Sequence, residues 1–265
     1  MLGETDLNSL QALIKKDIPS FEVAYKDESV LMRALALLTS PFNPDFLTRY
    51  ITTWGTRVYF PSRQFFLGNP ANSFRNLAHE YVHLWDAKEH PTFKLSYLFP
   101  QVLAGLPLFG FMLLAGANCW LVILPVLAYV LSCFARKLTK AMFWVALVVL
   151  LGGTALLAWW LTGWVSLVLL GTVLFLGPWP APWRVQWELR GYGMNVALAQ
   201  WTYGAFTDSH RSSILAQFVG SPYFFMSWSK SSVAEKLDDF SRRASSGDLQ
   251  KEQPYGRVFG LVPKG

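Results

Sequence analysis

The pattern of hydrophobic and polar residues divides the chain into a mixed first part, a long apolar region and a mixed last part. In the first part, Leu7, Leu10 and Ile14 mark one face of a helix that Asp6 can cap. Short strands are indicated by the alternating runs FEVAYKD and TRVYFPS. The pattern therefore predicts a mixed α/β fold for residues 1–94.

The segment GNPANSFRNLAHEYVHLWDAKEHP predicts a longer helix within this part. Asn69 is suited to cap the helix, and Pro70 fits its first turn. Pro91 ends the pattern, so the helix is expected from about Pro70 to about Glu89. It holds two of the chain's four histidines, and a third follows at its end.

The apolar region follows this helix directly. Between Tyr97 and Trp183 the only charged residues are Arg136, Lys137 and Lys140. A transmembrane helix needs about 20 apolar residues, and the basic loop separates two blocks of about forty residues each. The sequence therefore predicts about four transmembrane helices, arranged as two hairpins.

The number and orientation of these spans follow from smaller features. The second span is short and contains Pro125, which leaves two spans or a re-entrant segment as alternatives. The positive-inside rule places the central basic loop in the cytoplasm, and an even number of spans brings both ends to that side. We therefore expect a multi-pass protein of a bacterial-type inner membrane, with both soluble ends cytoplasmic.

After the apolar region, WRVQWELRGYGMNVALAQWTY predicts one more helix, despite its two glycines. The predicted domain organisation has four parts. They are the first part of the soluble domain at 1–94, a transmembrane region at 95–178, the second part of the soluble domain at 179–245 and a flexible tail at 246–265.

Composition limits the classes of function. Charged residues make up 15% of the chain, whereas a typical soluble domain has about 25%, and this deficit supports the membrane prediction. The net charge is +6, but the basic residues are scattered, so nucleic acid is not expected as a partner. The two cysteines lie in the apolar region and indicate no disulfide framework.

The motif HEYVH carries the candidate chemistry. His79 and His83 are four residues apart, so both imidazoles project from one face of a helix and can reach one metal ion. Hydrolytic zinc sites use three protein ligands and leave a position for water, whose proton Glu80 can take. The motif therefore predicts a Zn²⁺ site for amide hydrolysis; a solvated helix with two ordinary histidines is the alternative.

The third ligand is expected far along the chain. A metzincin pattern fails because Asp86 and Glu89 occupy the positions of its glycine and its third histidine, and His90 is expected at the helix end. Glu188 follows the apolar region on a predicted helix rich in aromatic residues, and four spans return it to the side of the motif. We therefore predict Glu188 as the third ligand, with a solvated glutamate as the alternative.

Asp86 has a possible supporting role. It lies one turn after His83 and can accept the ring N–H of that histidine. The alternative is a surface carboxylate beside Lys88.

These residues carry a resemblance to a known family. His79, Glu80, His83 and a distant Glu188, with predicted membrane helices between them, resemble the integral-membrane gluzincins of the HtpX and CAAX prenyl protease type. The resemblance covers about residues 56–210. It implies an α-helical membrane protein with a mixed α/β zincin-like soluble domain, and a zinc metallopeptidase activity.

The chain departs from this family at two points, so it is expected to form a divergent or separate group. Tyr192 stands where the family usually has an aspartate, four residues after the third ligand, and no span is visible before the motif. The resemblance also implies an oxyanion-stabilising residue downstream of the third ligand. His210 and Tyr192 are candidates for this role, as are Arg190 and Arg211, and a surface position for His210 is the alternative.

The sequence thus predicts a zinc-dependent membrane metalloendopeptidase, with polypeptide substrates and with membrane lipid around its spans. The alternative is a catalytically inactive zincin-like membrane protein that binds a partner or acts as a scaffold, although the intact Glu80 argues against it. A transporter or channel is disfavoured because the predicted spans carry no ionisable residue at mid-depth.

Overall fold

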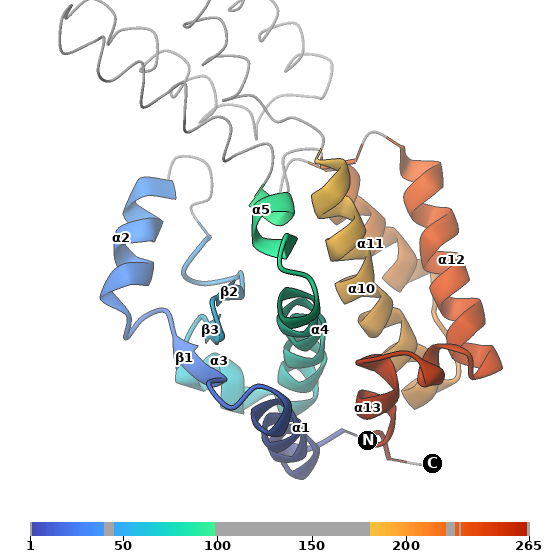
Figure 1. The fold of residues 1–265 in the computed structure, drawn as a ribbon, viewed down its shortest axis with the longest axis horizontal. Coiled ribbons are helices and arrows are strands. Elements are labelled where there is room, and N and C mark those ends of the chain that lie inside the picture. The colour runs from blue at the N-terminus through green and yellow to red at the C-terminus, as the bar shows by residue number, and fades with distance from the viewer. Residues whose placement is uncertain (1, 40–44, 99–180, 221–225, 228, 264–265) are drawn as a thin grey trace, which may run out of the picture.

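Two long helices lie at the centre of the fold, α4 (Pro70–Glu89) and α10 (Pro182–Tyr203), and they pack against each other (Figure 1). The computed structural model describes residues 2–39, 45–98, 181–220, 226–227 and 229–263. These residues form mostly helices, together with a three-stranded sheet. The sheet and the N-terminal helices lie on one side of α4, and the C-terminal helices lie on the side of α10.

The sheet consists of β1 (Glu22–Tyr25), β2 (Thr52–Trp54) and β3 (Arg57–Phe60), in the order β1-β3-β2. β3 is the central strand and buries three residues in succession; it pairs parallel to β1 and antiparallel to β2. β2 and β3 form a hairpin in which Gly55 has a φ of 67°, a left-handed conformation that glycine adopts without strain. β2 is thus an edge strand, and it packs against α4.

Four shorter helices belong to the N-terminal part. They are α1 (Glu4–Asp17), α2 (Val30–Thr39), α3 (Arg63–Gly68) and the short α5 (Phe93–Leu98) after α4. Three of them, α1, α3 and α5, contact α4. The predicted apolar face of α1 is confirmed, because Leu7, Leu10 and Ile14 are buried, and α1 packs against α4.

The predicted helix over residues 70–89 is also confirmed. The Asn69 side chain accepts a hydrogen bond of 3.0 Å from the backbone N–H of Asn72, and Pro70 occupies the first turn. Local capping signals therefore determine where α4 begins.

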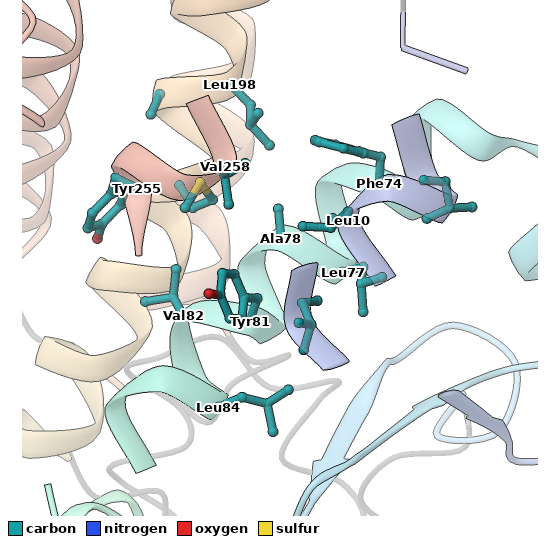
Figure 2. Close-up of a cluster of buried hydrophobic side chains, with 14 of the residues drawn as sticks. Leu10, Phe74, Leu77, Ala78, Tyr81, Val82, Leu84, Leu198, Tyr255 and Val258 are labelled. Atoms are coloured by element: carbon teal, nitrogen blue, oxygen red, sulfur yellow. The ribbon is translucent and has the colours of Figure 1, made fainter. Parts of the chain in front are cut away.

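The C-terminal part contributes to the same hydrophobic core. Its elements are α11 (Asp208–Val219), α12 (Lys230–Ser246), the 3-10 helix η4 (Leu249–Lys251) and α13 (Tyr255–Phe259). Figure 2 shows Tyr255 and Val258 in one cluster with Leu10 of α1 and Tyr81 of α4. The prediction of a flexible tail at 246–265 is therefore wrong for the elements η4 and α13, in which Leu249, Tyr255 and Val258 are buried.

The prediction of an α-helical membrane protein needs a larger correction. Among the described residues, no helix is both long enough and apolar enough to cross a membrane. The longest helices, α4 and α10, carry charged residues, which in α10 are Arg184, Glu188 and Arg190. The described residues 93–98, where the first span is expected to begin, form the short helix α5. This finding contradicts the predicted transmembrane architecture and the predicted multi-pass inner-membrane location. The remainder of the predicted spans, from 99 to 178, lies outside the described residues.

Candidate metal centre

The two histidines of the HEYVH motif lie on the face of α4 that meets α10. Their Nε2 atoms are 3.1 Å apart, and their rings cross at 76° with centroids 4.9 Å apart. His83 is nearly fully buried, whereas His79 is partly buried. The helical spacing of the motif therefore directs the same nitrogen of both rings to one point.

Glu188 reaches this point from α10 and is buried with 4% of its surface exposed. Its Oε2 atom lies 3.7 Å from His79 Nε2 and 3.8 Å from His83 Nε2. One ligand atom from each of the three residues lies within 4.8 Å of the others, so this group could hold a metal ion. Tetrahedral coordination at about 2.0–2.1 Å separates ligand atoms by roughly 3.3 Å, which is close to the spacing found here.

The electrostatics of the three groups favour positive charge between them. Burial works to raise the pKa of Glu188, but the two imidazoles and Arg184 outweigh it and hold the pKa well below its usual value. Burial works to lower the pKa of His83, but the Glu188 carboxylate outweighs it, so this pKa is raised. An ionised carboxylate beside two imidazoles suits a divalent cation.

Tyr97 of α5 holds the second oxygen of Glu188, because its hydroxyl donates a hydrogen bond to Oε1. Arg184, one turn before Glu188, has its Nε 3.8 Å from the same oxygen. Burial of Tyr97 raises its pKa well above the ordinary value and keeps the hydroxyl protonated as a donor. These contacts leave Oε2 to face the histidines. The sequence interpretation missed Tyr97, which it assigned to the start of the apolar region.

Glu80, the acid of the HEYVH motif, contacts the sheet. The hydroxyl of Thr53, on the edge strand β2, donates a hydrogen bond of 2.6 Å to Glu80 Oε2. The Glu80 carboxylate is partly exposed, and Thr53 fixes one of its oxygens. The hydrogen bond orients this carboxylate, and its role as a general base stays a prediction.

Comparisons with known proteins identify no relative of this chain. No family model matches it, and no curated protein or solved structure is significantly similar to it. The resemblance to membrane gluzincins therefore stays a prediction. The case for function rests on the arrangement of His79, Glu80, His83 and Glu188.

Asp86 has a different partner from the predicted one. Its carboxylate is completely buried and accepts hydrogen bonds of 3.0 Å from Arg190 Nε through both oxygens. Arg190 Nη2 lies 2.8 Å from Oδ1. The Nδ1 atom of His83, which Asp86 was expected to contact, has no hydrogen-bond partner within the described ranges. Asp86 therefore joins α4 to α10 near the ligands and does not orient His83.

Of the other predicted residues, one contacts the candidate ligands and two do not. Tyr192 lies at the site, with its ring 4.8 Å from that of His79 in an edge-to-face contact. His210 is exposed in the first turn of α11, where its Nδ1 lies 3.2 Å from Thr207 Oγ1. His90 ends α4 and packs against Trp187, with ring centroids 5.4 Å apart. Neither His90 nor His210 belongs to the metal-binding group found among the described residues.

The two glycines of α10 are explained by what they pack against. A Cβ atom at Gly191 would lie 2.6 Å from His79 Nε2, and one at Gly193 would lie 2.6 Å from the Phe240 ring. Both distances are shorter than real contacts allow. The glycines therefore let α10 approach His79 on one side and α12 on the other.

Proposed function

We propose that this protein is a zinc metallopeptidase that hydrolyses peptide bonds, with His79, His83 and Glu188 as the metal ligands. The observation that carries the proposal is the convergence of two imidazole Nε2 atoms and one carboxylate oxygen, each within 4.8 Å of the others, from helices about a hundred residues apart in sequence. Two histidines and one glutamate form a ligand set found in hydrolytic zinc sites.

The donor set supports zinc over magnesium and calcium. Imidazole nitrogens suit zinc, copper, iron and nickel, whereas magnesium and calcium prefer sites composed entirely of oxygen. Three protein ligands leave a position for water, which structural zinc sites do not have. When bound, zinc supplies Lewis acidity: it polarises a carbonyl oxygen and lowers the pKa of water to about 7.

The side chains of the site have separable roles in this proposal. Glu80 takes a proton from the attacking water and passes it to the amine nitrogen as the C–N bond breaks. Thr53 keeps the Glu80 carboxylate in place by its hydrogen bond to Oε2. Tyr97 and Arg184 hold the far oxygen of Glu188, so that its other oxygen faces the histidines.

The first experiment measures the metal content of the purified full-length protein and its variants by mass spectrometry. We expect about one zinc per chain in the wild type and a loss of zinc in His83→Ala and Glu188→Ala. His90→Ala is the matched control, because it removes an exposed histidine at the end of the same helix. The proposed site would be excluded if the wild type carried no stoichiometric zinc. It would also be excluded if both variants kept as much zinc as the wild type.

The second experiment tests the chemistry with a library of quenched fluorescent peptides. Glu80→Gln should retain zinc and lose cleavage by about 10²–10⁴-fold, the contribution usual for a general base. Glu89→Gln, an exposed glutamate on the same helix, should cleave as the wild type does. Equal cleavage by Glu80→Gln and the wild type would eliminate Glu80 as the base, and zinc binding without any cleavage would favour the inactive zincin-like alternative.

A further inference from the structure

Asn195 contacts His79 on the side of the ring that faces away from the other two proposed ligands, His83 and Glu188. These three residues, His79, His83 and Glu188, are called the ligand group below. Asn195 lies seven residues after Glu188, so both side chains project from one face of α10. Its Nδ2 atom is 3.5 Å from Nδ1 of His79, while Nε2 of the same ring faces His83 and Glu188. Asn195 therefore meets the ring nitrogen that the ligand group does not use.

The amide oxygen of Asn195 lacks a hydrogen-bond donor within the described ranges. Oδ1 is buried, and none of the described residues forms a hydrogen bond with it. The oxygen and nitrogen of an asparagine amide exchange places when the amide rotates by 180°, with little change in shape. In the rotated orientation, Oδ1 lies against His79 Nδ1, where it can accept the N–H of the ring.

The tautomer of His79 decides which of the two orientations suits the site. A neutral imidazole carries one proton, and the nitrogen without it is the metal ligand. If Nδ2 donated to Nδ1, the proton would sit on Nε2, which faces the ligand group. If Nδ1–H donates to Oδ1, the buried oxygen is satisfied and Nε2 is free to bind a cation.

We propose that Asn195 is a positioning residue for His79: its amide oxygen accepts the Nδ1–H of the ring and thereby keeps Nε2 unprotonated toward the ligand group. The inference rests on the metal site proposed above. Metal-binding histidines commonly donate their second nitrogen to an oxygen acceptor.

Two neighbours of Asn195 on α10 support the same ring position. Gly191 leaves room for the ring edge that carries Nε2, and Tyr192 packs against the ring edge-to-face. The backbone and the aromatic ring thus fix where the imidazole lies, whereas the amide of Asn195 selects its tautomer.

The direct test is the tautomer of His79 in the metal-free, full-length protein. Protein labelled with ¹⁵N at its four histidines gives long-range ¹H–¹⁵N spectra that identify the protonated nitrogen of each neutral ring, and His79→Gln assigns the resonance. We expect the Nδ1–H form in the wild type and in Asn195→Asp, which keeps an oxygen acceptor, and a loss of this preference in Asn195→Leu. A wild type with the proton on Nε2 would overturn the inference, even if Asn195→Leu failed to fold.

The second test is zinc affinity, measured by competition with a chromophoric chelator. Asn195→Leu should bind zinc about 10–100-fold more weakly, whereas Asn195→Asp should bind at least as tightly as the wild type. Gln186→Leu is the matched control, since it removes an exposed amide from the same helix. Equal affinities of Asn195→Leu and the wild type would also overturn the inference. The tautomer is measured without metal or substrate, so its result stands whether or not the protein is a peptidase.

Discussion

Gly191 sets the distance between α10 and the first histidine of the motif. A methyl group there would lie 2.6 Å from His79 Nε2 and 2.7 Å from Cε1, against the nitrogen proposed to bind zinc. Glycine in a helix normally costs about 0.5–1 kcal/mol relative to alanine. Its presence in the middle of α10 is therefore explained by space at the site and not by helix formation.

We expect Gly191→Ala to weaken zinc binding by at least about 10-fold, because the ring must move away from the ligand group. The measurement is the chelator competition used for Asn195. Gly193→Ala is the matched control, since its methyl group meets Phe240 of α12 instead and should lower thermal stability more than zinc affinity. Wild-type zinc affinity in Gly191→Ala would show that the ring has room to shift without loss.

Lys26 is a completely buried lysine directly after β1. Its Nζ donates a hydrogen bond of 2.7 Å to the Phe46 carbonyl and lies 3.8 Å from the centre of the Phe46 ring. Burial lowers its pKa from 10.5 to about 7, against a smaller opposing effect of Glu80. The folded protein thus binds this proton more weakly than the unfolded chain does.

The lowered pKa predicts a pH-dependent stability. Between about pH 7 and pH 10.5 the unfolded chain holds the Lys26 proton while the folded protein has released it, so this residue makes stability rise with pH. Below about pH 7 the buried charge costs several kcal/mol. Lys26→Met should therefore be more stable than the wild type at pH 7, and the difference should shrink toward pH 10.5 in urea unfolding. A difference that does not change with pH would contradict the lowered pKa.

At the scale of elements, caps and residue spacing within one segment are enough to predict a helix. They do not predict which faces of two helices meet. The cap at Asn69 and the four-residue spacing of His79 and His83 are properties of a single segment, so the sequence is sufficient to predict α4 and the face that carries both histidines. Glu188 could be proposed from its residue type and its position on the next polar helix. Tyr97 and Asn195 could not, because their roles depend on which faces of α5 and α10 meet α4.

The pair of Asp86 and Arg190 joins α4 and α10, the two helices that carry the proposed ligands. Asp86 is completely buried, and the Arg190 side chain is one-third exposed. Asp86→Ala should lower the free energy of unfolding by about 2–4 kcal/mol, somewhat below the usual loss for a fully buried pair, because Arg190 retains part of its hydration. The double variant with Arg190→Met should recover part of the loss.

The measurement for this pair is a double-mutant cycle by urea unfolding, together with zinc affinity. Asp239→Ala is the control for ion pairs at the surface, in which Asp239 contacts Arg242 and Arg243, and it should cost at most about 1 kcal/mol. Additive effects of the two substitutions at Asp86 and Arg190 would mean that the pair does not act as a unit.

At the scale of the whole molecule, the low content of charged residues led to the wrong prediction of a membrane protein. The membrane prediction rested on the scarcity of charge between Tyr97 and Trp183, a property that is averaged over a long segment and says nothing of where helices begin and end. No helix of the described ranges can span a membrane, and Tyr97 itself lies in a six-residue helix, where it contacts Glu188. The same averaging made residues 246–265 look like a loose tail, because polar residues outnumber the few apolar ones that the core uses.

The C-terminal elements connect both halves of the described fold. Arg257 of α13 pairs with Asp17 of α1 at 2.7 Å, and Asp17 also accepts a hydrogen bond from Tyr81 of α4. The Tyr255 hydroxyl donates a hydrogen bond of 2.8 Å to the backbone oxygen of Arg190 in α10. The last described helix therefore contacts α1 and α10 directly and is linked to α4 through Asp17.

This arrangement predicts that Tyr255 contributes to the stability of the whole protein. Tyr255→Ala should cost about 3–5 kcal/mol, because it leaves a cavity in the core, and Tyr255→Phe about 1 kcal/mol for the lost hydrogen bond. Lys251→Ala, a highly exposed residue of the same segment, should change the free energy of unfolding by no more than about 0.5 kcal/mol. Urea unfolding monitored by tryptophan fluorescence measures all three. If Tyr255→Ala were as stable as the wild type, α13 would be a surface attachment on a core that is stable without it, as the flexible-tail prediction requires.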